Sequence, residues 1–264
     1  MNKFDIHTIK KFPKIELHCH LDGSVSGLQV YENVKLLGIN ATKDEILNKI
    51  IAPEICQDLT EYLSCFEWLT KCLKNPTLIF LAIEDICRQA IEENIIYLEL
   101  RFSPYHLSND KFTMKQVVEA VIEAVNKMKD KYPLKIGIIL CLMRGREESI
   151  NNQVIELANQ FRDKIVGLDL AGNESKYPTK MYLKQLALIN YLEIPFTIHA
   201  GETGDFDNIR DAILAGAKRI GHGIAAKKSE EVVSLIRERN ITLEMCPKCN
   251  IQTKASKNWN DYPF

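Results

Sequence analysis

The chain has 264 residues, of which 46% are hydrophobic and 26% are charged. This balance is typical of a globular protein, and it excludes a disordered tail, a collagen-like repeat and a disulfide mini-protein. The 34 basic and 35 acidic side chains give a formal net charge of −1. We therefore expect neither the basic footprint of a nucleic-acid binder nor a basic membrane-surface cluster.

Cysteine usage and the N-terminus indicate a cellular compartment. Several of the eight cysteines lie within apolar runs, where free buried thiols suit a reducing environment. Residues 1–11 are polar and basic and lack the apolar core of a secretory signal. The longest apolar stretch, Ile136–Met143, is too short to span a bilayer. These features predict a cytoplasmic protein with no membrane partner.

Short runs rich in Ile, Leu and Val alternate with longer helical patterns along the chain. Seven of these runs are too short for helices and predict strands: Ile15–His20, Ile95–Phe102, Leu134–Leu142, Ile165–Leu170, Pro195–His199, Arg219–Gly221 and Thr242–Cys246. No repeat, low-complexity tract or linker marks a boundary, so we expect a single domain over residues 1–264.

Capping residues mark the starts of the helices between these runs. Asn75-Pro76 places a cap residue before a proline at the first helical position. The segment 113–116 has the form of a capping box. Asp207 is predicted to cap a helix that stops at Gly216. Ser229, followed by two acids, starts another.

A repeated βα order predicts a parallel sheet covered by helices, as either a (β/α) barrel or an open doubly wound sheet. An open sheet that binds dinucleotides carries a Gly-x-Gly-x-x-Gly turn after a strand. The sequence has no such turn, which favours the barrel.

Four of the six histidines fall at the C-terminal ends of predicted strands: His18, His20, His199 and His222. In a barrel, these ends form the active site. Because alternate residues of a strand point the same way, the side chains of His18 and His20 are expected to lie on the same side of the strand, where both can bind one metal ion. A single strand histidine is more often an ordinary hydrogen-bonded residue. A His-x-His pair with a distant histidine, however, is the ligand set of a catalytic zinc site.

Two further motifs lie near these positions. Glu202 follows His199 across two small residues; it is either an ordinary loop carboxylate or, beside a metal, a general acid or base. Cys246 and Cys249 form a Cys-x-x-Cys motif. One known class of zinc enzymes pairs His-x-Glu with Pro-Cys-x-x-Cys, and this sequence matches neither element. We interpret both cysteines as incidental.

Six segments in order, from residue 13 to the C-terminus, resemble the adenosine deaminases, a family of zinc-dependent (β/α)8 barrel hydrolases. They are Pro13–Gly23, Glu99–Pro104, Asp169–Glu174, His199–Glu202, Arg219–Gly223 and Glu244–Pro247, with Asn250 beyond. The resemblance implies one Zn²⁺ and a purine nucleoside as the small-molecule substrate. It also implies a role in purine salvage and no protein or nucleic-acid partner.

Site roles follow from the resemblance, residue by residue. His18, His20 and His199 correspond to the zinc ligands. Glu202 corresponds to the acid that protonates purine N1, and His222 to the residue that orients or deprotonates the attacking water.

The remaining implied contacts concern the substrate. His20 and Asp22 correspond to substrate contacts, with Asp22 on a ribose hydroxyl. Gly172 corresponds to a backbone donor to ring N3. The apolar positions of segment 59–69 resemble a lid over the purine, or form a plain packed helix face. The implied reaction converts adenosine, or 2'-deoxyadenosine, to inosine or 2'-deoxyinosine and ammonia.

The sequence also departs from the family pattern. The family's last strand ends in an Asp-Asp motif that contributes a zinc ligand and a purine contact, and this sequence has no Asp-Asp pair. Seven predicted strands stand where a barrel needs eight. We therefore expect a barrel incomplete at its C-terminus, and severely reduced or no deaminase activity for this chain alone. The leading hypothesis is an adenosine deaminase, or part of one. The alternatives are an inactive or weakly active fragment, and a relative that acts on adenine or an N6-methyl-adenine nucleotide.

Overall fold

The computed structural model describes residues 5–263. Within them, seven strands form one sheet whose order follows the sequence from β1 to β7. The strands are β1 (Lys14–His20), β2 (Ile95–Phe102), β3 (Lys135–Met143), β4 (Gly167–Ala171), β5 (Phe196–Ala200), β6 (Arg219–His222) and β7 (Thr242–Glu244). Each matches a predicted run to within two residues at either end.

The strand order distinguishes the two architectures left open by periodicity. The pairs β1–β2 and β3–β4 through β6–β7 are parallel. A doubly wound sheet reverses its strand order at a switch point, whereas a barrel adds each strand beside the one before it. The sequential order of these strands, with helices between them, confirms the TIM-type (β/α) barrel class.

Packing divides the chain into two compact units, which are described separately. The N-terminal unit comprises residues 1–50 and 68–138, and the C-terminal unit comprises residues 51–67 and 139–264. Strand β3 contributes residues to both units. The single domain over residues 1–264 stays a prediction.

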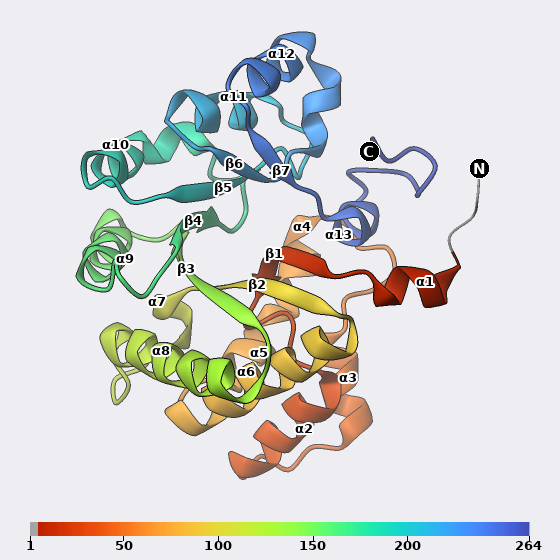
Figure 1. The fold of residues 1–264 in the computed structure, drawn as a ribbon, viewed down its shortest axis with the longest axis vertical. Helices are drawn as coiled ribbons and strands as arrows, with labels where there is room; N and C mark the ends of the chain where they lie inside the picture. Colours follow the sequence, from red (N-terminus) through yellow and green to blue (C-terminus); the bar gives the residue numbers. More distant parts are fainter. Residues whose placement is uncertain (1–4, 264) are drawn as a thin grey trace. The chain divides into compact units, whose positions relative to one another are not determined.

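The N-terminal unit packs helices against β1 and β2. Its helices are α1 (Ile6–Lys11), α2 (Gly27–Leu36), α3 (Lys43–Ile50), α6 (Pro76–Glu92), α7 (Pro104–Leu107) and α8 (Met114–Lys131). The two longest, α6 and α8, lie side by side (Figure 1) and bury their apolar faces. Asn75 caps α6, and the side chains of Thr113 and Gln116 form the predicted capping box of α8.

The C-terminal unit contains β4–β7 and the helices α4 (Leu59–Ser64), α9 (Glu148–Gln160), α10 (Leu183–Tyr191), α11 (Asp207–Leu214), α12 (Glu230–Glu238) and α13 (Pro247–Gln252). Two 3₁₀ turns, η1 (Thr179–Tyr182) and η2 (Ile224–Lys228), also belong to it. Helix α5 (Phe66–Lys71) crosses the boundary between the units.

The helix starts in the C-terminal unit test two further predictions. Ser229 caps α12, as predicted. The prediction that Asp207 caps α11 is wrong, because Asp207 is the first helical residue and the cap position is Phe206. The carboxylate of Asp205 accepts the Asp207 N–H instead. The helix ends before Gly216, whose φ of +103° suits a residue without a side chain.

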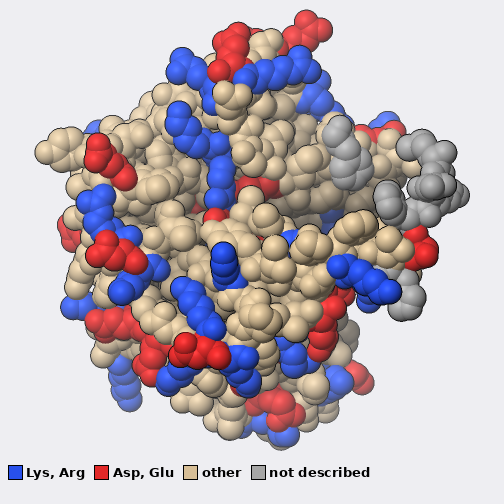
Figure 2. All heavy atoms as spheres, in the orientation of Figure 1, with Lys and Arg blue, Asp and Glu red and all other residues tan. Residues whose placement is uncertain are grey.

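The distribution of surface charge and the burial of the cysteines match what the composition predicts. Basic and acidic side chains are interspersed over the face drawn in Figure 2. All eight cysteines are free thiols, and six are buried. No helix within residues 5–263 combines the length and apolar character needed to cross a bilayer.

Candidate active site

His18 and His20 lie near each other at the end of β1, in the N-terminal unit. Their ring centroids are 5.2 Å apart, as expected for alternate residues of a strand. Cys19, between them, is buried instead, and burial raises the pKa of its thiol to about 12. The Glu16 carboxylate accepts the His18 backbone N–H at 2.7 Å. These contacts leave two partly exposed imidazoles close together at this strand end.

Arg101 of β2 fastens this end of β1. Its fully buried guanidinium donates to the Leu17 carbonyl at 2.5 Å, and its own carbonyl accepts the Leu21 N–H at 2.8 Å. Asp22 follows directly and is also buried. Burial raises the pKa of the Asp22 carboxyl to about 6.

His199 ends β5 in the C-terminal unit and is oriented by a neighbouring strand. Its Nδ1 lies 2.9 Å from the nearer carboxylate oxygen of Asp169 on β4. A carboxylate at this nitrogen makes it the donor and leaves Nε2 as the lone-pair nitrogen. Metal-binding histidines commonly have such a carboxylate partner, so the donor set at this strand end fits a zinc ligand.

His222 ends β6, where the backbone turns sharply. Its φ is +66°, and Gly223 follows at +67°. A Cβ at residue 223 would lie 2.8 Å from the Leu243 side chain, so only glycine fits this turn without a shift. The turn leaves the His222 ring buried, with its centroid 5.3 Å from that of His199. Two imidazoles thus meet at the C-terminal ends of neighbouring strands.

Glu202 lies beside His222, with Oε2 3.3 Å from the Nε2 of that ring. The carboxyl is 6% exposed. Burial raises its pKa well above the ordinary value; the charge of Glu174 raises it further, and Arg144 opposes the shift. A raised pKa favours the protonated form of the carboxyl, which can donate a proton.

Glu174 fixes the loop that carries Glu202. Its fully buried carboxylate accepts the Gly201 N–H at 2.8 Å, the Thr203 N–H at 2.7 Å and the Thr203 hydroxyl at 2.8 Å. The two amides flank Glu202 in the sequence. Charge-assisted hydrogen bonds of this kind restrict the backbone on both sides of that residue.

Arg144 is the buried cation of the C-terminal unit's site. Its guanidinium donates to the carbonyls of His199 and Tyr177, each at 2.7 Å, and to the Thr179 hydroxyl at 3.1 Å. Gly172 lies beside it, and a Cβ there would be in ordinary contact with Arg144 atoms at 3.4 Å. Its φ of +101° is the reason that glycine is favoured at this position.

The structure gathers the predicted site residues into two groups. The C-terminal unit brings together His199, Glu202 and His222, with Gly172 after β4. The N-terminal unit carries His18, His20 and Asp22 at and after the end of β1. Their functional roles stay predictions.

Sequence reasoning assigned no role to four further buried residues of this site: Arg144, Asp169, Glu174 and Asn250. One signal could have found Asp169: it is a charged residue inside β4, a strand buried at every position. Buried charges need partners, so an acid there indicates a nearby donor. The other three carry no such local signal.

The predicted lid segment forms two short helices, α4 and α5, separated at Cys65. Within the C-terminal unit, Asn173 donates to the Thr60 hydroxyl of α4 at 3.1 Å. This contact places α4 near the loop after β4; a lid role stays a prediction.

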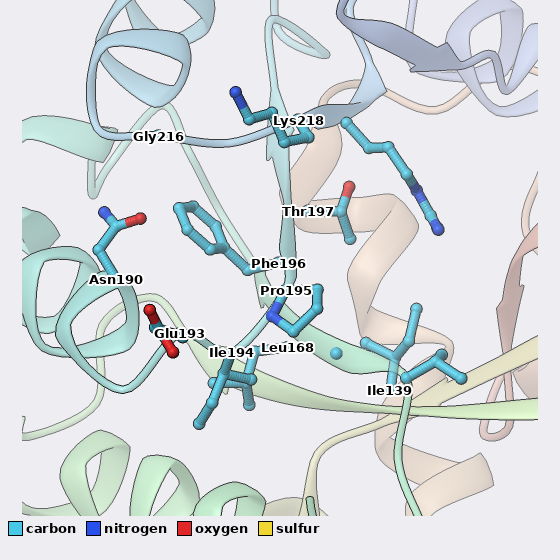
Figure 3. A pocket seen from close by; sticks show the side chains of 13 residues that line it. Ile139, Leu168, Asn190, Glu193, Ile194, Pro195, Phe196, Thr197, Gly216 and Lys218 are labelled. Atoms are coloured by element: carbon cyan, nitrogen blue, oxygen red, sulfur yellow. The ribbon is translucent and has the colours of Figure 1, made fainter.

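A separate pocket lies at the opposite ends of the same strands (Figure 3). It has a volume of about 330 Å³, and its lining includes the start of each of β4, β5 and β6: Gly167, Phe196 and Arg219. None of the predicted site residues lines it.

The sequence matches the adenosine deaminase family over residues 13–264. The adenosine deaminase of Enterococcus faecalis is 38% identical over 259 residues, covering 97% of this chain and 77% of the relative. That of Clostridium acetobutylicum is 36% identical over 262 residues, covering 97% and 78%.

Solved structures give the same fold. The Arabidopsis N6-mAMP deaminase superposes with a TM-score of 0.86 at 24% identity, covering 97% of this chain and 78% of that one. An adenine deaminase from Arthrobacter aurescens gives a TM-score of 0.84 at 20% identity, covering 95% and 77%. On the strength of the sequence matches, the chain belongs to the adenosine deaminase family of hydrolases.

Proposed function

We propose that the chain catalyses the hydrolytic deamination of adenosine and 2'-deoxyadenosine in purine salvage. Water adds to C6 of the purine, the C6–N6 bond breaks, and ammonia leaves to give inosine or 2'-deoxyinosine. The observation that carries the proposal is the Glu202–His222 pair, a buried carboxyl with a raised pKa against an imidazole.

Glu202 is the proton donor in this proposal. A purine ring resists water because attack at C6 places negative charge on the ring nitrogens. Proton transfer from Glu202 to N1 removes that charge as it develops, and the raised pKa favours the protonated carboxyl that this step requires. The resulting carboxylate can take up a proton from the attacking water and pass it to the leaving nitrogen.

His222 orients the water for attack, and Glu174 positions Glu202 through the amides on either side of it. Gly172 donates its backbone N–H to ring N3, where a side chain would intrude. Asp22 accepts a hydrogen bond from a ribose hydroxyl, and His20 contacts the substrate. A nucleoside supplies both the ring and the sugar that these contacts require.

We propose that His18, His20 and His199 hold a Zn²⁺. The Asp169–His199 contact supports this ligand set, because it leaves Nε2 of His199 unprotonated. When bound, Zn²⁺ lowers the pKa of water and makes a nucleophile available near pH 7. An amidohydrolase from Burkhoderia ambifaria with 17% identity was solved with bound Zn, which is consistent with this choice of metal.

The test is a substrate panel on the purified, zinc-supplemented chain. Adenosine, 2'-deoxyadenosine, adenine and N6-methyl-AMP are compared by ammonia release, and bound metal is measured by elemental analysis. We expect the highest kcat/KM for the two nucleosides, one zinc per chain, and loss of activity after treatment with a chelator.

Two results would contradict the proposal. A higher kcat/KM for adenine or N6-methyl-AMP assigns the chain to a different deaminase reaction. A rise in melting temperature with adenosine, without ammonia release, identifies a binding protein or an inactive deaminase, since a ligand that binds only the folded state stabilises it.

A further inference from the structure

A buried chain of hydrogen bonds leads away from His222 within the C-terminal unit. Nδ2 of Asn250, on α13, lies 3.0 Å from Nδ1 of His222. The Tyr262 hydroxyl donates to Oδ1 of the same amide at 3.0 Å. All three side chains are buried, and Asn250 has no exposed surface. The proposed reaction uses neither Asn250 nor Tyr262, so their contacts require a separate explanation.

The two hydrogen bonds of the Asn250 amide show which way it faces. The Tyr262 hydroxyl donates to Oδ1, so the oxygen of the amide is turned toward Tyr262. The nitrogen of the amide, Nδ2, is therefore turned toward Nδ1 of His222.

An amide Nδ2 is only a donor, so His222 Nδ1 must be an acceptor without a proton. A neutral imidazole carries its proton on one nitrogen, which leaves Nε2 as the protonated one. We infer that Asn250 and Tyr262 are positioning residues that hold His222 in the Nε2–H tautomer.

The Nε2–H tautomer limits which steps His222 can perform in the proposed reaction. Its Nε2 lies 3.3 Å from Glu202 Oε2, so His222 donates a hydrogen bond on this side and has no lone pair there for a proton. The ring orients water or the carboxyl, and proton transfer belongs to Glu202. This consequence rests on the proposed function, whereas the tautomer itself does not.

The direct test is ¹H–¹⁵N NMR of the zinc-loaded chain with ¹⁵N-labelled histidine. The His222 signals are assigned as those absent from His222→Gln. We expect the wild-type ring to carry its proton on Nε2. Asn250→Asp replaces the donor with an acceptor of the same shape, and we expect the proton to move to Nδ1. Tyr262→Phe removes one hydroxyl and frees the amide to turn, so we expect a mixture of tautomers.

Kinetics provide the second readout, because a purely structural role would alter stability rather than kcat alone. For Asn250→Asp, we expect kcat for adenosine to fall about tenfold or more, with KM within about twofold. The matched controls are Asn159→Asp on α9 and Tyr191→Phe on α10, both at exposed positions. They should leave the His222 signals and kcat unchanged.

The outcomes separate this inference from the proposed function. A wild-type His222 protonated on Nδ1, or a ring unchanged in both Asn250→Asp and Tyr262→Phe, overturns the inference. If Asn250→Asp fails to fold, Tyr262→Phe alone decides, and an unmixed Nε2–H signal overturns the role of Tyr262. If the expected tautomers appear but adenosine is not deaminated, the proposed function fails and the positioning role stands.

Discussion

The two ends of β4, β5 and β6 carry very different side chains, although they belong to the same strands. His199 and His222 lie at the C-terminal ends of β5 and β6, and Asp169 lies in the middle of β4; all three are buried and hydrogen-bonded. The N-terminal ends line the pocket of Figure 3, where the charged side chains of Glu193 and Lys218 are exposed. Burying charge is unfavourable unless each group has a partner. The buried groups Asp169 and His199 have such a partner in each other, whereas Glu193 and Lys218 remain in contact with solvent.

Among the substitutions at the C-terminal ends of the strands, we expect replacement of the proposed proton donor to lower kcat the most. For Glu202→Gln, we expect kcat to fall by a factor of roughly 10² to 10⁴, because the amide has the same shape but no transferable proton. Stability near neutral pH should change by no more than about 1 kcal/mol, since a protonated carboxyl and an amide are both neutral. Steady-state kinetics and thermal unfolding measure the two effects; a comparable loss of stability would indicate a structural role.

Removing the partner of His199 tests the proposed zinc ligand. For Asp169→Asn, we expect zinc affinity to fall about 10- to 100-fold, because the carboxylate that fixes the ring orientation becomes an amide. Competition with a chelator measures the affinity. Unchanged affinity would exclude Asp169 as the orienting group of a metal ligand.

The pH dependence follows from the raised pKa of Glu202. The protonated acid is the active form, so the titration of Glu202 should make kcat/KM fall about tenfold per pH unit above its folded-state pKa. Because this pKa exceeds its unfolded value, the matching contribution to stability is present below the unfolded pKa and is lost as pH rises through the folded one. Glu202→Gln should abolish that slope in the free energy of unfolding, and an unchanged slope would assign it to another group.

Weakening the hydrogen bonds between Glu174 and the loop that carries Glu202 should have a smaller effect on kcat. Glu174→Gln turns one acceptor into a donor that faces a buried N–H, which costs about 1–3 kcal/mol. We expect a lower melting temperature and a kcat reduced several-fold. Thr203→Val, which removes only the hydroxyl contact, should give a milder loss of both. Full activity in both variants would show that the loop holds Glu202 in place without these hydrogen bonds.

We expect the smallest effect on kcat and stability from a substitution at the N-terminal ends of the strands, beside the pocket. For Lys218→Ala, we expect kcat within about twofold of wild type and stability within about 0.5 kcal/mol, as for an ordinary exposed position. The same kinetic and unfolding assays apply. A large loss of kcat would show that the two strand ends are coupled.

Local sequence signals were sufficient where structure is decided by nearby residues. The capping box at Thr113 and the Asn75-Pro76 start of α6 formed as predicted, because these hydrogen bonds span three residues. The prediction of an Asp207 cap failed because α11 begins one residue earlier than expected: Asp207 is its first helical residue, and its own N–H is accepted by the Asp205 carboxylate.

By itself, the sequence determined the positions of the strands along the chain and, through its motifs, the family and the candidate site residues; their order within the sheet came from the structure. Only the tertiary structure decided the hydrogen-bond partners, the pKa shifts and the tautomers of those residues. The Asp169–His199 contact spans 30 residues and the Asn250–His222 contact 28, distances over which no periodicity carries information. The burial that raises the pKa of Glu202 and the amide orientation that selects a histidine tautomer depend on packing from several strands at once, so neither can be read from a local pattern.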